Sequence, residues 1–358
     1  MIAFNKRASS GSVKQYKINY TPASTNIGNV WVDASKNQVD GKMFGLRKAV
    51  HNVVKVAMQS AIVSNDDLRA ETNSFNLIAS PGFPELLDEM VALSGDRRNT
   101  AFVIGDTPFR LKADATSTKN WATNANTASE NGEDGLLTSS PYAAVYYPSA
   151  LSTNLDGTNV VVPASHVALR TLAYNDQVAF PWFAPAGFQR GLVQNATSVG
   201  FVNPADGEYT PVSLNEGQRD NLYLNKVNPI ASFPGRGLVV FGQKTLNPVA
   251  SALDRINVAR LVVHIRERLD DIVKPFLFEP NDDITRQNAK GVVDSFLSNL
   301  VVQRGLFDYV TVCDGSNNTP TRIDRNELYI DIAIQPVKAI EFIYIPIRIQ
   351  NTLGSTAS

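Results

Sequence analysis

The stretch that decides the fold class runs Phe75-Asn-Leu-Ile-Ala79, Ser80-Pro-Gly-Phe-Pro84, Glu85-Leu-Leu-Asp-Glu-Met-Val-Ala-Leu93 and then Ala101-Phe-Val-Ile-Gly105. Its first and last pieces are short, continuously apolar runs, as expected of strands that are buried on both faces. The piece between them follows a proline-rich turn and carries its apolar residues at helical spacing. Two buried strands around a helix predict a parallel β-α-β unit, and therefore an α/β sheet.

Residues 1–247 extend this unit into a larger α/β domain. The apolar spacing and the apolar runs predict helices at 42–63, 164–173 and 219–225 and strands at 142–147, 160–162 and 238–242. Residues 1–40 are poorly defined, with short strand-like pieces at 16–20 and 29–32. The small polar residues of 112–140 predict an exposed loop or insertion.

Residues 248–358 are predicted to form a smaller α+β domain. Apolar residues at helical spacing predict helices at 253–273 and 284–304, and Asp282 or Asp283 is suited to cap the second helix. Three strands follow, at 309–313, 327–334 and 340–350. The predicted fold class is thus α/β, a mixed sheet flanked by helices, with a smaller C-terminal α+β domain.

Composition and charge argue against several classes of protein. The net charge of −1 leaves no basic field for nucleic acid, and no run reaches the roughly 18 apolar residues of a membrane span. Cys313 is the only cysteine, so the chain has neither an internal disulfide nor a cysteine zinc cluster, and a buried inert thiol is expected. The N-terminus has no apolar core of a signal peptide, which favours manufacture in the cytoplasm without membrane anchoring.

The sequence contains no signature of catalysis, a cofactor or a metal site. His51, His166 and His264 lie far apart, so they cannot form a zinc motif of the HExxH type, and no GxSxG elbow occurs. The nearest approach to a phosphate loop is Gly237-Leu-Val-Val-Phe-Gly242-Gln-Lys-Thr245, in which Gln243 stands where the lysine must be. Its four middle residues favour a strand that ends at Gly242. We therefore expect no enzyme activity and no cofactor.

The last predicted strand, Ile340-Glu-Phe-Ile-Tyr-Ile-Pro-Ile-Arg-Ile-Gln350, has an unusual position. Its residues alternate around Pro346, which cannot donate to a strand ladder, and it stands close to the end of the chain. Two interpretations are open: a plain edge strand of its own domain, or a strand added to the sheet of a neighbouring subunit. The candidates for such intersubunit pairing are Phe342, Ile343, Tyr344, Ile345, Ile347 and Ile349.

Together, an ordered series of short motifs resembles the contractile tail sheath proteins of myovirus-type bacteriophages. The resemblance runs from about residue 70 to 350. Besides the stretch at 75–85 it rests on Asp96-Arg-Arg followed by Ala101–Pro108, Ser140–Pro148, Phe183–Gly191, Asn228-Pro-Ile with Phe233-Pro-Gly235, Phe241–Leu246, Asp254–Leu261, Phe278-Glu-Pro-Asn281, and Pro336 with Glu341-Phe.

The resemblance implies a structural protein that works by repacking and not by catalysis. Sheath subunits form a helical homo-oligomer around a tail tube, with a baseplate and a tail terminator as further partners. They are assembled in the host cytoplasm, become part of the virion tail, and shorten without nucleotide hydrolysis to drive the tube through the host envelope. Relatives carry an N-terminal arm that this chain does not clearly show. We therefore expect either a compact variant or the C-terminal portion of a longer sheath.

The resemblance also suggests that the helix after the Phe-Glu-Pro-Asn link faces the tube. Arg286 and Arg304 are eighteen residues apart, which is five turns of 3.6 residues, so both should project in one direction with Lys290 beside them. These three cations are the candidate contacts with an acidic tube. Ala289, Val293, Phe296, Leu297 and Leu300 are expected to form the core face of the helix.

Two alternatives remain at the level of sequence. A nucleotide- or ligand-binding α/β enzyme would use the β-α-β unit and needs polar groups that converge beyond its strand ends. The second alternative is another phage tail protein, of the tube or the baseplate. Tube proteins are typically short β-barrel rings, and the helices predicted to begin at residues 42, 253 and 284 fit that architecture poorly.

Overall fold

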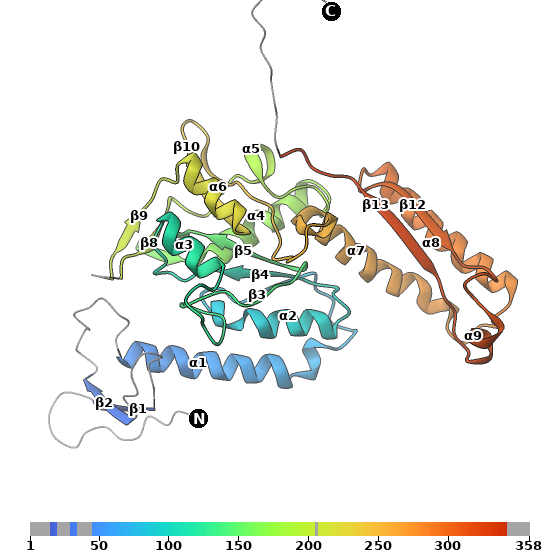
Figure 1. The fold of residues 1–358 in the computed structure, drawn as a ribbon, viewed down its shortest axis with the longest axis horizontal. Coiled ribbons are helices and arrows are strands. Elements are labelled where there is room, and N and C mark those ends of the chain that lie inside the picture. Colours follow the sequence, from blue (N-terminus) through green and yellow to red (C-terminus); the bar gives the residue numbers. More distant parts are fainter. Residues whose placement is uncertain (1–14, 20–28, 34–44, 205–206, 342–358) are drawn as a thin grey trace, which may run out of the picture.

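The computed structural model describes residues 15–19, 29–33, 45–204 and 207–341 (Figure 1). At the start of the described chain, β1 (Gln15–Asn19) pairs antiparallel with β2 (Asn29–Asp33), where the two short strand-like pieces were predicted. The long helix α1 (Gly45–Ser64) follows.

A mixed five-stranded sheet forms the centre of the main domain. Its strand order is β11-β10-β5-β4-β3, and all neighbours are parallel except β10 and β11. The strands are β3 (Leu77–Ala79), β4 (Phe102–Asp106), β5 (Ala143–Tyr147), β10 (Val227–Phe233) and β11 (Gly237–Val240). The predicted parallel pair around a helix is confirmed, because β3 and β4 flank α2 (Leu87–Asp96).

Helices cover both faces of this sheet, which explains the continuously apolar strands. Along β4, Phe102 and Ile104 point into one hydrophobic cluster and Val103 into the other. The first cluster is closed by α4 (Ala164–Val178) and the start of α7 (Ile256–Val273). The second is closed by α2, α3 (Ala115–Ala122) and α6 (Glu216–Leu224), and Figure 1 shows α1 as an outer layer beyond α2.

A second sheet, of four antiparallel strands, lies beside the main one. Its order is β7-β6-β8-β9, with β6 (Ser149–Thr153), β7 (Asn159–Val162), β8 (Ser198–Val202) and β9 (Tyr209–Pro211). Gly200 is required where β8 meets β9, because a Cβ atom there would lie 2.1 Å from the carbonyl oxygen of Thr210.

The expectation that residues 112–140 form an exposed loop is wrong for much of this segment. It contains α3, and Trp121 on that helix is 2% exposed and donates its indole N–H to the Gly132 carbonyl at 2.8 Å. Leu136 is also buried in the second cluster. Trp121 and Leu136 show no periodicity among the many small polar residues, yet their burial is enough to anchor the segment on the core.

The C-terminal unit projects from one side of the main domain (Figure 1). It contains α7, α8 (Asp283–Val302), β12 (Leu306–Val312), the short α9 (Pro320–Asp324) and β13 (Asp331–Pro336). Asp282 caps α8 by accepting the Thr285 backbone N–H at 2.8 Å, as predicted. Cys313 is buried, also as predicted. Ile340 and Glu341 lie in no strand, and residues 342–350 of the predicted last strand are outside the described part of the chain.

Helix α7 joins the two units. Ile256, Ala259 and Val263 belong to the core of the main domain, whereas Leu261 and Ile265 pack with α8 in a third hydrophobic cluster. Trp182 of the main domain also belongs to that third cluster. The boundary near residue 247 therefore remains a prediction, and the apolar packing is continuous across it.

Asp106 occupies the carboxyl end of β4, close to where an α/β enzyme would bind its ligand. Its buried carboxylate accepts hydrogen bonds from the backbone N–H groups of Gly82 (2.8 Å) and Ser165 (2.6 Å) and from the Ser165 hydroxyl (2.7 Å). Burial nevertheless raises the pKa of Asp106 from 3.8 to about 6, because desolvation of the charged form outweighs these bonds. This carboxylate ties the turn before α2 to the start of α4.

The raised pKa of Asp106 predicts a pH dependence of stability. Because the folded state binds this proton more tightly than the unfolded chain, the carboxyl group favours folding most below pH 4 and progressively less up to pH 6. The rise in the pKa of Asp106 from 3.8 to about 6 corresponds to a change of about 3 kcal/mol in the free energy of unfolding across this pH range. We expect Asp106→Asn to remove this fall in the free energy of unfolding, measured by urea titration between pH 4 and 7. The exposed Asp156→Asn should leave the fall in place, and an unchanged profile in Asp106→Asn would contradict the assignment.

Candidate subunit-contact site

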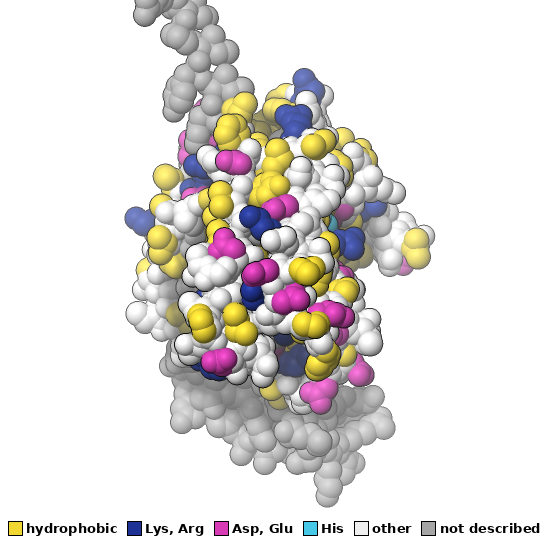
Figure 2. Space-filling model, turned by 90° about the vertical axis from the view of Figure 1, so that its right-hand side faces the viewer, with side chains coloured by type: hydrophobic (Ala, Val, Ile, Leu, Met, Phe, Trp, Pro, Cys, Tyr) yellow, Lys and Arg dark blue, Asp and Glu magenta, His cyan; other side chains and the backbone are white. Residues whose placement is uncertain are grey.

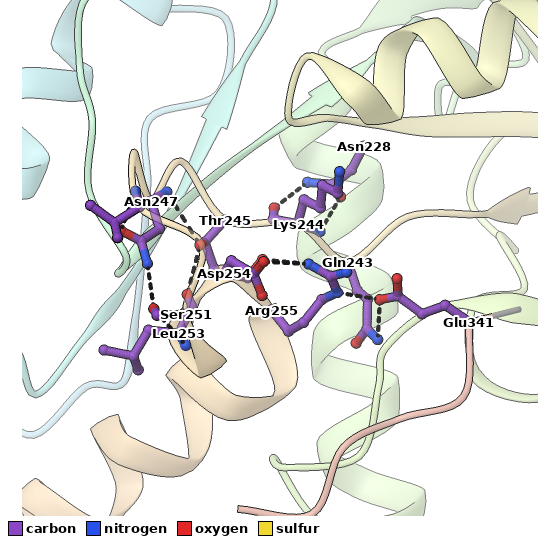
Figure 3. Close-up of polar contacts among 11 residues, drawn as sticks. Asn228, Gln243, Lys244, Thr245, Asn247, Ser251, Leu253, Asp254, Arg255 and Glu341 are labelled. Carbon is purple, nitrogen blue, oxygen red and sulfur yellow. Dashed lines mark hydrogen bonds and ion pairs between the residues drawn. The ribbon is translucent and has the colours of Figure 1, made fainter.

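The last described residue, Glu341, is held against the main domain by two side chains (Figure 3). Its carboxylate accepts a hydrogen bond from the Gln243 side-chain amide at 3.0 Å and an ion-paired hydrogen bond from Arg255 Nε at 2.5 Å. Arg255 also pairs with Asp254 at 2.9 Å. The Glu341 side chain is 15% exposed, so this contact is largely shielded from water. The chain is therefore fixed to the main domain at Glu341, immediately before the candidate pairing residues that begin at Phe342.

The segment that carries Gln243 is itself rigidly placed. The Asn228 amide donates to the carbonyls of Val145 (3.0 Å) and Lys244 (2.8 Å), and its oxygen accepts the Lys244 backbone N–H (2.7 Å). Gly242 allows this close approach, because a Cβ atom there would lie 2.9 Å from the Asn228 side-chain oxygen. Ile256 at the start of α7 donates its backbone N–H to the Gln243 carbonyl at 2.8 Å, so β11 and α7 are joined at this point.

This geometry also settles how the near-phosphate-loop sequence is used. The predicted strand is present as β11 (Gly237–Val240), but it ends at Val240 and not at Gly242. Gln243 binds Glu341, and the Lys244 ammonium lies 4.4 Å from the centre of the Tyr223 ring. Burial, together with the neighbouring Arg255, lowers the pKa of Lys244. Burial and then the Glu341 carboxylate raise the pKa of Tyr223. These side chains thus form one packed polar cluster at the base of α7.

The β12–β13 hairpin is a second candidate contact. It is a sheet of two strands only within the described residues, paired from Val312–Asp331 to Leu306–Pro336. One face packs on α8 through Leu306, Tyr309, Ile332 and Ile334. On the outer face Phe307 is 72% exposed and Val310 is 56% exposed. The hairpin thus presents strand edges and apolar side chains together.

The three cations predicted at α8 differ in their surroundings, and Arg304 lies just beyond the end of the helix. Arg286 is only 7% exposed, and its guanidinium donates to Asn281 Oδ1 (2.9 Å) and pairs with Asp283 (2.5 Å). The expectation that Arg286 is part of an exposed cationic row is therefore wrong. Lys290 is half-buried, whereas Arg304 is exposed, with its guanidinium carbon 5.9 Å from the centre of the Phe183 ring.

The burial of Arg286 follows from its position on the helix. Arg286 precedes Ala289 by three residues and Val293 by seven, so it shares the face that packs on the hairpin. The predicted core face is confirmed for Ala289, Val293, Leu297 and Leu300, which are buried, and Phe296 is partly buried. The predicted shared direction of Arg286 and Arg304 is wrong, because Arg286 is buried on the core face whereas Arg304 lies beyond the end of α8, has a φ of +62° and is exposed. The six exchange-strand candidates, from Phe342 to Ile349, lie outside the described residues.

Sequence reasoning missed the cluster around Glu341. Gln243 and Glu341 are 98 residues apart and Arg255 and Glu341 are 86 apart, so no local spacing relates them.

No helix among the described residues is long and apolar enough to cross a membrane. The same residues contain no group of three or more histidine, cysteine or carboxylate side chains arranged for a metal ion.

Comparison with known proteins gives a consistent result. Residues 249–350 match the family model of the phage tail sheath C-terminal domain. The tail sheath protein of Vibrio phage KVP40 is 40% identical over 171 residues, which are 48% of this chain and 24% of that protein. The tail sheath protein of Enterobacteria phage T4 is 30% identical over 256 residues, which are 70% of this chain and 37% of that protein. The chain thus spans well under half the length of these two relatives.

Solved structures show the same fold. The helical sheath of the anti-feeding prophage in its contracted state has a TM-score of 0.61 at 20% identity, and the match covers 90% of this chain and 78% of that chain. The contracted sheath complex of the extracellular contractile injection system PVC has a TM-score of 0.62 at 21% identity over 82% of this chain and 74% of that chain. The resemblance to contractile tail sheath proteins is thus confirmed, and residues 249–350 match the model of the phage tail sheath C-terminal domain.

Proposed function

We propose that this chain is a structural subunit of a phage contractile tail sheath. It polymerises helically around the tail tube and shortens from a metastable extended state to drive the tube through the host envelope. Its partners are neighbouring copies, the tube protein, the baseplate and the tail terminator; it is assembled in the host cytoplasm and resides in the virion tail. The observation that carries the proposal is the two-stranded β12–β13 sheet in a chain with a sheath fold.

A two-stranded sheet with open edges is an incomplete structure. An isolated hairpin is marginally stable, and its unpaired N–H and C=O groups are a template for further strands. Here the outward Phe307 and Val310 add exposed apolar surface next to those edges. Strands supplied by neighbouring subunits complete this sheet and connect the lattice.

The anchor at Glu341 favours a strand that crosses to a neighbour. After β13 ends at Pro336, the Val337 backbone N–H still bonds to the Gly305 carbonyl at 3.1 Å, and the chain then passes to Gln243 and Arg255 on the main domain. No tight turn returns it to the edge of β13 within the described residues. The segment 340–350 therefore starts away from its own hairpin, and we assign it to the sheet of another subunit.

The movement that shortens the sheath then takes place at the contacts between subunits. Helix α7 packs into both the core of the main domain and the third cluster, and the Arg260–Asp176 ion pair fixes it to α4. The subunit thus moves as one body while its neighbours change. Two packings of the lattice that differ by a few kcal/mol per subunit suffice, because the difference sums along the array. Such repacking needs no nucleotide.

Tube contact is assigned to two cations, the half-buried Lys290 on α8 and the exposed Arg304 just after that helix. Arg286 stabilises the start of α8 instead, since its guanidinium is used by Asn281 and Asp283. Each exposed ion pair with an acidic tube contributes at most about 1 kcal/mol. Weak individual contacts suit a sheath that must leave its tube during shortening.

Incubation with purified tail tubes tests this function. The unmodified chain should coat the tubes as an extended sheath, seen by electron microscopy. Lys290→Glu with Arg304→Glu should still polymerise but should not coat tubes, because like charges repel. The matched pair Lys119→Glu and Arg170→Glu, which changes two exposed cations elsewhere, should coat tubes normally. Bare tubes with the unmodified chain would contradict the proposed function, and normal coating by the Lys290/Arg304 variant would move the tube contact elsewhere.

A further inference from the structure

Three phenylalanines from separate segments form an exposed aromatic cluster on the main domain. They are Phe188 in the short helix α5 (Gly187–Arg190), Phe233 at the end of β10 and Phe241 just after β11. The ring centres are 5.0 Å apart for Phe188 and Phe233 and 4.9 Å apart for Phe233 and Phe241. Phe188 is 46% exposed and Phe241 is 40% exposed. Contiguous exposed aromatic surface of this kind marks an interaction site.

Two arginines make this aromatic cluster cationic. The Arg219 guanidinium lies 5.0 Å from the centre of the Phe233 ring, and the Arg236 guanidinium lies 5.4 Å from that of Phe188. None of the ion pairs among the described residues contains either arginine, although Arg219 donates to the Leu214 carbonyl at 2.9 Å. We call these five residues the Arg-Phe patch. Arginine and aromatic side chains are the residues that contribute most at protein interfaces.

A surface of opposite character lies at the link between α7 and α8. Leu277 is 66% exposed, Phe278 is fully exposed and Ile284 is 70% exposed. Phe278 also has a φ of +71°, a backbone conformation that is costly for a bulky side chain and that points to a functional constraint. Glu279, Asp282 and Asp283 surround these apolar residues, and all three are exposed. We call the residues from 277 to 284 the acidic knob.

The two surfaces cannot meet within one molecule. In Figure 1 the acidic knob lies at the far end of α7, beside α9, whereas α5, α6 and the end of β10, which carry residues of the Arg-Phe patch, lie on the main domain. Figure 2, which faces the outer end of the C-terminal unit, shows acidic and apolar side chains there, with Lys and Arg side chains among them. Two complementary surfaces on opposite parts of one chain form a head-to-tail contact, and repetition of such a contact builds a helical array.

We infer that the acidic knob of one subunit docks on the Arg-Phe patch of a second copy of this chain. Phe278 inserts among Phe188, Phe233 and Phe241, while Glu279 pairs with Arg236. The inference rests on the proposed self-assembly and adds a contact that does not involve strand exchange. Charge complementarity selects this occupant over the chain's own C-terminal segment, because residues 342–358 contain Arg348 and no acidic residue.

Charge reversal and reciprocal rescue test the contact. Arg236→Glu and Glu279→Arg should each raise the critical concentration for assembly about tenfold or more, read by light scattering and electron microscopy. The double variant should return to within about threefold of the unmodified chain, since the pair is restored with its signs exchanged. Phe278→Gly should weaken assembly while raising the melting temperature, because glycine tolerates the positive φ. Arg170→Glu, an exposed change on α4, is the matched control and should assemble normally.

A cysteine pair separates failure of this contact from failure of the proposed function. With Phe188→Cys and Phe278→Cys in one chain, oxidation should yield a ladder of intermolecular disulfides, while Cys313 stays buried and unreactive. A ladder without cylinders would support the contact and contradict the sheath function. Cylinders with no ladder and no rescue by the double charge reversal would overturn the contact. Weakened assembly from Phe188→Ala but not from Phe278→Ala would also overturn it, because another segment would then cover the patch.

Discussion

Replacing Arg260 with methionine should lower the free energy of unfolding by about 3 kcal/mol, because it leaves a partly buried carboxylate without its partner. Arg260 on α7 is 3% exposed and forms two hydrogen bonds to the Asp176 carboxylate on α4, at 2.9 and 2.5 Å. The Asp176 side chain is 24% exposed, so water compensates part of the loss and the effect falls at the lower end of the usual range. Urea unfolding followed by circular dichroism measures the change.

Two further variants isolate the ion pair. Asp176→Leu combined with Arg260→Met should recover much of the lost stability, because removing both charges leaves no unpaired group. Arg268→Met, on the exposed side of the same helix, should change the free energy of unfolding by less than about 0.5 kcal/mol. A loss below about 0.5 kcal/mol for Arg260→Met would show that this pair does not fix α7 to the main domain.

Deleting residues 340–358 should leave a folded monomer that cannot polymerise. The hydrophobic clusters end before this segment and Ile340 is 83% exposed, so the main loss within the subunit is that of the bonds from Glu341 to Gln243 and Arg255. The strand assigned to the neighbouring subunit is removed, and the β12–β13 sheet stays incomplete in every copy. Analytical ultracentrifugation and electron microscopy should show single subunits at concentrations where the full chain assembles.

A shorter deletion and a point substitution separate the effect of losing the strand from that of losing the Glu341 anchor. Deleting 342–358 retains the Glu341 anchor but should still prevent assembly, since it removes the same strand. Glu341→Gln in the full chain should assemble at reduced efficiency, because the charge pairing with Arg255 is lost while the strand remains. Normal cylinders from the 340–358 deletion would show that the segment is an internal edge and not an exchanged strand.

The elements that periodicity could reveal were predicted well. The parallel pair at 77–79 and 102–106 and the helices α1, α7 and α8 follow from apolar spacing, because each buries one stripe or both faces of a continuous run. The cap at Asp282 follows from local chemistry in the same way. Asp106 shows the limit of such reasoning, since its hydrogen bonds come from Gly82 and Ser165, which are distant in the sequence.

The features that sequence reasoning missed are those that tertiary contacts decide. Trp121 anchors a segment that looks like a loop, because a single large side chain carries its burial without periodicity. Arg286 was predicted to be a surface cation, yet it is buried, because it lies on the core face of α8 and bonds to Asn281 and Asp283. Glu341 belongs to a cluster with partners 86 and 98 residues away, which no local pattern relates.

Imaging of the purified protein, before and after treatment with urea or acid, tests whether this chain forms a sheath that shortens without a nucleotide. We expect long hollow cylinders, which become shorter and wider after treatment in the same way with or without ATP. Rings or discrete particles would contradict it. Shortening that strictly requires ATP and is abolished by changing Lys244 would contradict it as well, because Lys244 would then serve a nucleotide site and not the polar cluster beside Tyr223.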